Sequence, residues 1–254
     1  MQLIIIGSGT FIPDHRANSS YLLKTDDKNI IFDIGRGAIN NLQKVKIDLY
    51  KINYIFISHT HADHLSELIS LINLILDSPE KNKVYYKMLK IYGPRGIKKS
   101  INYLLKAYGL NKHKNLKRIE IKELKDRQKV SIEKTKIQPF YVFHNKHLIA
   151  STAYRIKNKN KIFVYSGDSS DCKGLREACK NANVAILEST LPKEICPKEH
   201  LSGEDAGRIA KDSNVKHLIL THIAKDYLKN AKKDAGKYFN GKITIARDLL
   251  IVGN

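Results

Sequence analysis

Ile55-Phe56-Ile57-Ser58-His59-Thr60-His61-Ala62-Asp63-His64 is an apolar run that ends in three histidines and one aspartate. The apolar residues before the histidines predict a buried strand, because short runs of β-branched and aromatic residues suit that role. Leucines and isoleucines then recur at helical spacing between Leu65 and Leu76. The polar side chains are therefore predicted where a strand ends and a helix begins, which is the edge at which α/β sheets collect ligands.

This cluster has the composition of a metal site. His59 and His61 are two residues apart in an extended segment, so both can grip one cation from the same side. Asp63 and His64 lie on the turn into the helix and can reach a second cation. Neutral imidazole and carboxylate are ligands for zinc and similar metals. The alternative is four unrelated polar residues on a loop. The chain has only ten histidines, so three within six positions favour the metal site.

The composition describes a globular protein of one large domain or two small ones. The 254 residues are 42% hydrophobic and 28% charged, which excludes a disordered chain. No apolar run approaches the ~18 residues of a membrane span. The segment from Met1 to Gly7 predicts a first strand and not a signal peptide. Three cysteines fit no disulfide framework and no CxxC pair, which favours a reducing cytoplasm.

The net charge of +20 is concentrated in one part of the chain. The segment Lys81–Lys129 holds sixteen Lys or Arg residues against three acids. This suggests a surface for a polyanion such as RNA or DNA. The alternative is a compositional bias toward lysine that solvates helix faces. Arginines are few in this segment, although tyrosines that can stack on bases are present.

Other strands are expected to end in polar residues as well. Asp33 follows one strand and is expected to orient a ligand histidine or to cap the next helix, two roles that are compatible. His144 and His147 both follow a second strand, and either is a candidate ligand. Asp168 stands at the tip of a tight turn, and His222 ends another apolar strand. This recurring pattern predicts a convergent polar edge suited to hydrolysis by a two-metal site.

The expected elements alternate along the chain without a linker or a repeat, so one domain over residues 1–254 is predicted. Strands are expected at 3–6, 20–23, 28–33, 54–57, 90–92, 119–124, 130–142, 151–157, 162–165, 184–187 and 217–222, with a last strand pair within 242–252. Helices are expected at 38–45, 65–76, 97–105, 206–210 and 226–238, with Ser202 capping the fourth of these.

The motifs together resemble the metallo-β-lactamase superfamily, and more narrowly its ribonuclease Z-like branch. The resemblance covers nearly the whole chain and rests on His59-x-His61-x-Asp63-His64 and on later segments that include Gly7-Ser8-Gly9-Thr10, Phe32-Asp33-x-Gly35, Tyr92-Gly93-Pro94-x-Gly96, Tyr165-Ser166-Gly167-Asp168, His200-Leu201-Ser202 and Leu220-Thr221-His222. It implies an α/β fold, an αββα sandwich of two mixed sheets with helices outside.

The resemblance also implies a ligand set for two divalent ions, zinc first, with manganese or iron as alternatives. One ion would bind His59, His61 and His147, the other would bind Asp63, His64 and His222, and Asp168 would bridge them. His147 is preferred over His144 because the family's histidine precedes a small residue by four positions and a Tyr-Arg pair by seven. His144 stays open as the alternative.

In the ribonuclease Z-like branch, the residues matching Glu188 and His200 form a charge relay in which the histidine protonates the leaving oxygen. Asp63 would bind metal and orient the attacking hydroxide. Without the resemblance, Glu188 would be a carboxylate behind the ligands, and His200 would be a neighbour of the Ser202 cap.

One departure from the branch concerns the substrate. Members that process tRNA carry a long arm between the third-motif histidine and the bridging aspartate, and here only 21 positions separate His147 from Asp168. A phosphodiesterase acting on RNA or a nucleotide is the leading hypothesis. A hydrolase of a small ester, lactone or thioester is the second, and a basic nucleic-acid-binding module with a vestigial metal site is the third. No membrane partner is expected, and relatives of this type often form homodimers.

Overall fold

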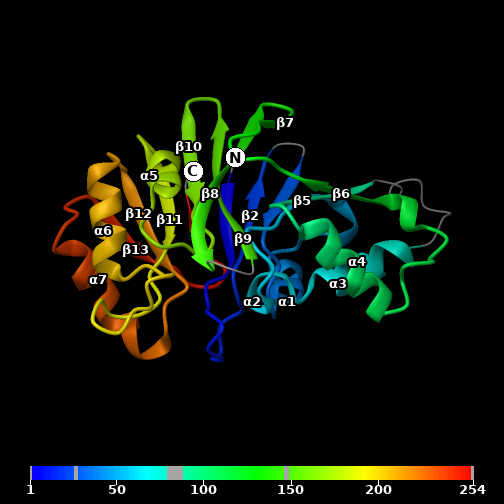
Figure 1. Cartoon of the computed structure of the whole chain (residues 1–254), viewed down its shortest axis with the longest axis horizontal. Coiled ribbons are helices and arrows are strands. Elements are labelled where there is room, and N and C mark those ends of the chain that lie inside the picture. The colour runs from blue at the N-terminus through cyan, green and yellow to red at the C-terminus, as the bar shows by residue number, and fades with distance from the viewer. Residues whose placement is uncertain (1, 26–27, 79–87, 146–148, 253–254) are drawn as a thin grey trace. The chain divides into compact units, whose positions relative to one another are not determined.

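The computed structural model of the chain describes residues 2–25, 28–78, 88–145 and 149–252 (Figure 1). The chain forms two compact units. The first unit consists of Met1–Phe11, His15–Glu123 and Arg247–Asn254, and the second consists of Ile12–Asp14 and Leu124–Ala246. Each unit is built on one seven-stranded mixed β-sheet.

The sheet of the first unit has the strand order β14-β1-β2-β3-β4-β5-β6. Its first three pairings are antiparallel and its last three are parallel. The parallel strands end at one edge, so the residues that follow β3 and β4 lie close together. The strands are β1 (Gln2–Gly7), β2 (Ser20–Lys24), β3 (Asn29–Phe32), β4 (Ile52–Phe56), β5 (Leu89–Gly93), β6 (Ile119–Glu123) and β14 (Ile251–Val252).

Helices cover one face of this sheet through a core of isoleucine and leucine side chains. These helices are α1 (Ala38–Lys44), α2 (Ala62–Leu65), α3 (Leu68–Leu76) and α4 (Ile97–Ala107). The expected continuous helix over 65–76 is wrong at its start, because a turn at Ser66 and Glu67 interrupts the helix and separates α2 from α3. The Glu67 carboxylate accepts hydrogen bonds from the backbone nitrogens of Gly37 and Ile39 at 2.6 Å. It therefore caps α1, whose first turn has no capping side chain of its own.

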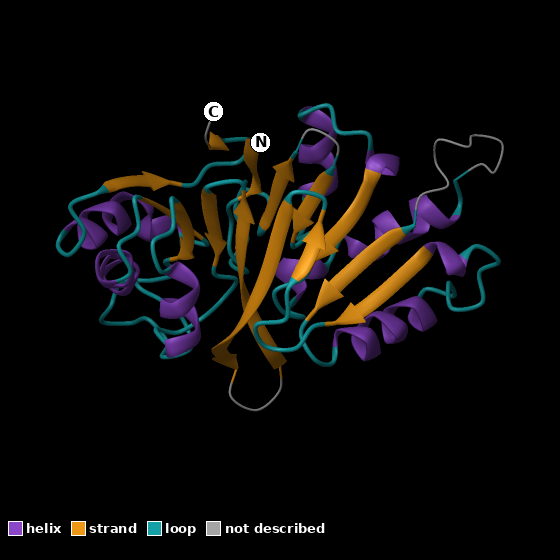
Figure 2. Cartoon of the chain, turned by 90° about the horizontal axis from the view of Figure 1, so that it is seen from above, coloured by secondary structure: helices purple, strands orange, loops and turns teal. Residues whose placement is uncertain are grey.

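The second unit repeats the same pairing pattern, with the strand order β13-β12-β11-β10-β9-β8-β7. From β7 to β10 the pairings are antiparallel and include the long β8–β9 hairpin, and from β10 to β13 they are parallel (Figure 2). The sequence showed no repeat, because different residues build the same topology twice. The strands are β7 (Val130–Ile132), β8 (Thr135–Asn145), β9 (Ile149–Asn158), β10 (Lys161–Tyr165), β11 (Val184–Glu188), β12 (His217–Thr221) and β13 (Lys242–Ile245).

Three helices pack on the sheet of the second unit: α5 (Lys173–Cys179), α6 (Gly203–Asp212) and α7 (Leu228–Gly236). Ser202 caps α6 in a reciprocal capping box with Asp205, which confirms the predicted cap. Glycines allow α6 to approach α7 closely, since a Cβ on Gly207 would lie 2.4 Å from the carbonyl oxygen of Ala235. The packing fixes the start of α6, and His200 lies two residues before the Ser202 cap.

The expected strand pair at the end of the chain is wrong. β13 continues the second sheet beside β12, whereas β14 pairs with β1 in the first sheet. Asp248, between them, accepts hydrogen bonds from Ser8 and Ala17 of the first unit. Within the part of the chain that the structure describes, no helix combines the length and the apolar character needed to span a membrane.

Candidate metal centre

The histidine cluster of the first unit lies at the ends of β3 and β4. His59 follows β4, His61 precedes α2, and Asp63 and His64 lie within α2. Gly35 allows α2 to lie against the end of β3, because a Cβ at that position would be 2.1 Å from the carbonyl oxygen of Asp63. Strand and helix thus bring the predicted residues together as the sequence indicated.

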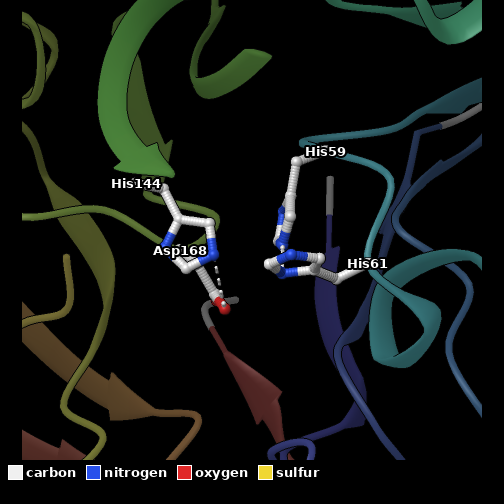
Figure 3. Close-up of side chains that lie close together, drawn as sticks. All are labelled: His59, His61, His144 and Asp168. Atoms are coloured by element: carbon white, nitrogen blue, oxygen red, sulfur yellow. Dashed lines mark hydrogen bonds and ion pairs between the residues drawn. The ribbon is translucent and has the colours of Figure 1, made fainter. Parts of the chain in front are cut away.

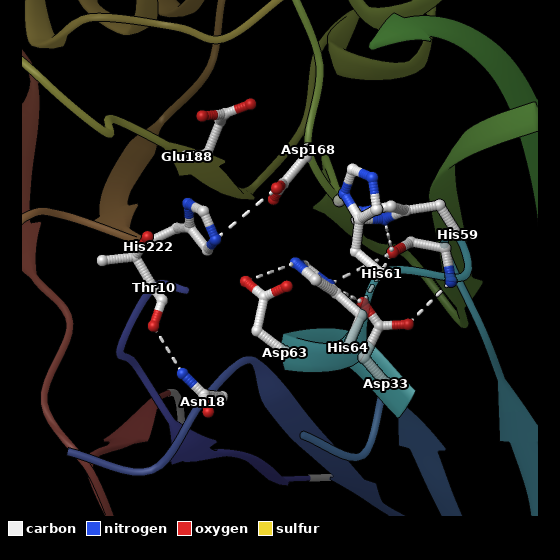
Figure 4. Close-up of polar contacts among 12 residues, drawn as sticks. Thr10, Asn18, Asp33, His59, His61, Asp63, His64, Asp168, Glu188 and His222 are labelled. Carbon is white, nitrogen blue, oxygen red and sulfur yellow. Dashed lines mark hydrogen bonds and ion pairs between the residues drawn. The ribbon is translucent and has the colours of Figure 1, made fainter. Parts of the chain in front are cut away.

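A buried carboxylate orders this cluster. The side chain of Asp33 is fully buried and accepts hydrogen bonds from the Ser58 backbone nitrogen, from Ser58 Oγ and from His64 Nδ1, at 2.6, 2.6 and 2.7 Å (Figure 4). These three donors stabilise a charge that would otherwise be costly to bury. With its proton on Nδ1, neutral His64 presents the Nε2 lone pair 3.5 Å from Asp63 Oδ2. Asp33 therefore orients a candidate ligand, and Glu67 takes the capping role instead.

His59 and His61 have the spacing of two ligands on one ion. His59 Nδ1 lies 3.0 Å from Ser58 Oγ, which donates to Asp33 and can therefore accept from the imidazole. His59 Nε2 lies 3.0 Å from His61 Nδ1 (Figure 3). Two nitrogens bound tetrahedrally to one zinc ion are about 3.4 Å apart, given a Zn–N distance of about 2.1 Å. The donor set of the first unit thus fits a metal ion.

In the second unit, Asp168 follows β10 and is surrounded by imidazoles. Its Oδ2 lies 3.5 Å from His222 Nε2 and 3.9 Å from His144 Nε2. His144 is buried, and its Nδ1 donates to the carbonyl oxygen of Glu199 at 3.1 Å. This bond assigns the proton to Nδ1 and leaves the Nε2 lone pair facing the carboxylate side. Figure 3 draws this pair.

Behind Asp168 lies a second carboxylate that orients a histidine. Glu188 is fully buried at the end of β11, and its Oε2 lies 2.8 Å from His200 Nδ1. Its other contacts are hydrogen bonds from the Ser169 backbone nitrogen to Oε1 at 2.6 Å and from Thr190 Oγ1 to Oε2 at 2.5 Å. The same Thr190 hydroxyl accepts from His222 Nδ1 at 3.0 Å. His200, Glu188 and His144 also form a group close enough to hold a metal ion.

Two of these residues have a backbone conformation that non-glycine residues rarely adopt. Asp33 and His222 have φ angles of 56° and 54°, in the left-handed region, directly after β3 and β12. Asp and His tolerate this region better than most residues, at an energetic cost. Such a conformation persists where the surrounding structure stabilises it. Hydrogen bonds to Ser58 and Thr190 hold the Asp33 and His222 side chains at these positions.

Among the described residues, the groups close enough to hold a metal ion contain no cysteine. Burial raises the pKa of the Cys179 thiol to about 12. It also raises the pKa of Cys196 to about 12, with the nearby Glu188 charge adding to the effect. Neither side chain is therefore a thiolate at neutral pH. The candidate ligands are imidazole and carboxylate groups, as the sequence predicted, and the fit with zinc, manganese or iron rests on those donors.

His147 lies outside the described residues, so its selection over His144 stays a prediction. Three contributors were missed from the sequence: the Ser58 hydroxyl, the Thr190 hydroxyl and the Glu199 carbonyl group. Each holds a histidine through a contact made only after folding. A small polar residue next to each strand-end motif was the available signal for Ser58 and Thr190, and no signal pointed to the Glu199 carbonyl.

Two mixed sheets flanked by helices, with histidines and carboxylates gathered at their strand ends, define an α/β fold of the metal-dependent hydrolase class. The sequence profile of the beta-lactamase superfamily domain matches residues 28–223. The chain belongs to this superfamily.

Relatives and solved structures agree over nearly the full length of the chain. A ribonuclease Z of Borreliella burgdorferi is 30% identical over 302 aligned positions, covering 96% of this chain and 94% of the relative. The metallo-beta-lactamase fold protein YhfI of Bacillus subtilis superposes with a TM-score of 0.84 at 22% identity, covering 99% and 98%. The short form of human tRNase Z gives 0.76 at 22% identity, covering 100% and 99%. The resemblance to the superfamily and to its ribonuclease Z-like branch is confirmed, as is the fold class.

Proposed function

We propose that this protein is a binuclear metal-dependent phosphodiesterase that cleaves RNA, and that both units act together as one hydrolase domain. The observation that carries the proposal is the pair formed by buried Glu188 and partly buried His200, with 2.8 Å between Oε2 and Nδ1, close to Asp168. A histidine held by a buried carboxylate is suited to proton transfer, and the leaving oxygen of an RNA phosphodiester needs a proton. The similarity to ribonuclease Z over 96% of the chain supports the same reaction class.

The ligand assignment we propose follows the motifs. One ion would be held by His59, His61 and a third histidine. The other ion would be held by Asp63, His64 and His222, and Asp168 would bind both ions. Divalent metal, when bound, would activate water and neutralise charge on the phosphate. Asp63 would orient the nucleophile, Asp33 and Thr190 would fix the tautomers of His64 and His222, and His200 would donate a proton from Nε2 to the leaving oxygen. We favour zinc because neutral imidazoles predominate.

The substrate we propose is RNA without a requirement for a whole tRNA. The alignment with the Borreliella burgdorferi ribonuclease Z runs over 302 positions, more than the 254 residues of this chain, so the relative carries insertions that this chain lacks. The short interval between His147 and Asp168 supports the absence of the tRNA-binding arm. We further infer a cytoplasmic setting from three free cysteines, and a homodimer from the resemblance alone.

The reaction class is tested with a panel of substrates. The purified protein, loaded in turn with zinc, manganese or iron, is assayed on bis-p-nitrophenyl phosphate, short RNAs, lactones and thioesters. Hydrolysis of the phosphodiesters supports the proposal. Activity confined to lactones or thioesters would replace it with the second hypothesis, and failure to load any metal would favour the nucleic-acid-binding module.

We expect His144, and not His147, to be the third ligand of the first ion. His144→Ala should lower the bound metal by about half, because its buried Nε2 lies 3.9 Å from Asp168 Oδ2 and its tautomer is fixed by Glu199. His147→Ala is the matched variant and should keep the wild-type metal content. Metal analysis after dialysis measures both. The reverse result would restore the selection of His147 made from the motif spacing.

Asp33→Asn should weaken metal binding ten- to hundredfold, as expected for the partner of a ligand histidine. Asparagine keeps the size of the side chain and tolerates the left-handed backbone. Its amide cannot accept from all three donors that Asp33 faces. Zinc affinity is measured by competition with a chelator. Asp48→Asn makes the same change at the half-exposed cap of a short helix, and unchanged affinity in both variants would contradict the role given to Asp33.

A further inference from the structure

A groove of about 390 Å³ opens on the second unit, at the end of the β8–β9 hairpin that is remote from His144. Lys136 is eight residues before His144 on β8, which is about 27 Å along an extended strand. Gln138 also lines the groove, and no carboxylate is among its lining residues. The cationic residues are Lys129, Lys134, Lys136, Arg155, Lys157 and Lys159.

The strand register places these cations together. Lys136 is directly opposite Lys157, and Gln138 is directly opposite Arg155. Like charges at opposing positions destabilise a sheet, so this pairing is not explained by stability. Arg155 is fixed, since its Nη1 donates to the carbonyl oxygens of Ala178 and Lys180 at 2.6 and 2.8 Å. The groove is therefore a partly ordered cationic surface.

The charge of the groove is not neutralised locally. Within residues 2–25, 28–78, 88–145 and 149–252, none of the five lysines forms an ion pair with a carboxylate. Three described cations of the basic segment Lys81–Lys129 differ in this respect. There Lys122 and Lys90 contact Glu120 at 2.6 and 3.8 Å, and Arg127 contacts Asp126 and Glu177. With no lining carboxylate and, in the described part of the chain, no ion pair on its five lysines, the groove is a candidate site for an external anion.

We propose that this groove binds the phosphate backbone of RNA and docks a part of the strand remote from the cleaved bond. Unpaired lysines on a concave surface provide the sequence-independent attraction that phosphates need. A stacked strand carries one phosphate per ~3.4 Å, so about 27 Å corresponds to about eight nucleotides. The inference rests on the proposed function in one respect, which is that the bound RNA is the substrate.

A charge-reversal variant tests the binding. Lys134→Glu, Lys136→Glu and Lys159→Glu are combined in one protein. The control combines Lys98→Glu, Lys99→Glu and Lys106→Glu, which lie on α4 in the first unit and change the net charge equally. Binding of a fluorescent 20-nucleotide single-stranded RNA is measured by anisotropy in EDTA, which prevents cleavage.

The groove variant is expected to bind RNA at least ~10-fold more weakly at ~0.1 M salt, and the control less than ~3-fold more weakly. The slope of log Kd against log salt should fall by about 2, because each of the three lost phosphate contacts contributes about 0.7 to the slope. The melting temperature should not fall, because Lys136→Glu places a carboxylate opposite Lys157. An equal loss of RNA affinity in the two variants, or no loss in either, would overturn the proposal that the groove binds RNA. Tighter binding of the wild type to phosphatidylserine vesicles than to RNA would do so as well.

Cleavage assays separate this inference from the proposed function. The KM of the metal-loaded wild type should fall as RNA lengthens to about eight nucleotides beyond the cleaved bond, and the groove variant should lose this dependence on length. If the wild type cleaves RNA with no such dependence on length, the proposed RNA docking in the groove is contradicted, while the proposed phosphodiesterase function is supported. If the wild type hydrolyses no phosphodiester, the function fails, while the anisotropy result still decides whether the groove binds RNA.

Discussion

Replacing Asp168 with asparagine is expected to lower turnover on RNA at least ~10³-fold and to reduce the bound metal to about half or less. Asp168 Oδ2 lies within 4.0 Å of a nitrogen of His144, His200 and His222, so one carboxylate serves three imidazoles. Asparagine is nearly isosteric and removes the charge. A loss of about 4 kcal/mol of transition-state stabilisation corresponds to this change in rate. Turnover and metal content are measured on the same preparation.

Asp171→Asn is the matched control for this experiment. Asp171 lies three residues further along the same loop, is exposed, and pairs with Arg176 through bonds of 2.6 and 2.7 Å. The substitution is chemically identical but should leave turnover and metal content near the wild-type values. If Asp168→Asn kept both quantities, Asp168 would not be a shared ligand, and the turn over Ser166–Ser169 would be only a turn.

The elements that carry strong periodicity could be predicted from the sequence. The strand that precedes His59, the strand at His217–Thr221 and the Ser202 cap of α6 all lie where local pattern placed them. Their signals are local, since apolar alternation and capping residues act within a few positions. The convergence of histidines and carboxylates at strand ends followed from the same reasoning, because parallel strands end at a common edge.

Features set by distant contacts could not be predicted in the same way. The break between α2 and α3 arises because Glu67 caps α1, a bond between residues about 30 positions apart. β13 and β14 were expected to pair with each other, but their partners β12 and β1 lie in different sheets. The tautomers of His144 and His222 depend on Glu199 and Thr190, which hold no metal in the proposed set. Such contacts are tertiary, and no periodicity in the chain encodes them.

Replacing His200 with alanine is expected to lower turnover on RNA by ~10²- to 10⁴-fold, the range for loss of a general acid. The bound metal should stay near the wild-type content, since His200 Nδ1 is held by Glu188 Oε2 at 2.8 Å. Glu188→Gln should cause a smaller loss, ~10- to 100-fold, because the histidine remains but its orientation weakens. Metal analysis and single-turnover cleavage measure the two effects separately.

Substrates with different leaving groups distinguish proton donation by His200 from a merely structural role of this residue. p-Nitrophenolate leaves without needing a proton, whereas the leaving oxygen of RNA needs one, so His200→Ala should reduce hydrolysis of bis-p-nitrophenyl phosphate far less than cleavage of RNA. His217→Ala is the matched control, since His217 is half-buried at the start of β12, donates to or accepts from Thr244 Oγ1 at 2.9 Å, and lies outside the site. Equal losses on both substrates would argue against proton donation. A loss of metal in His200→Ala would make His200 a ligand, in the group with His144 and Glu188.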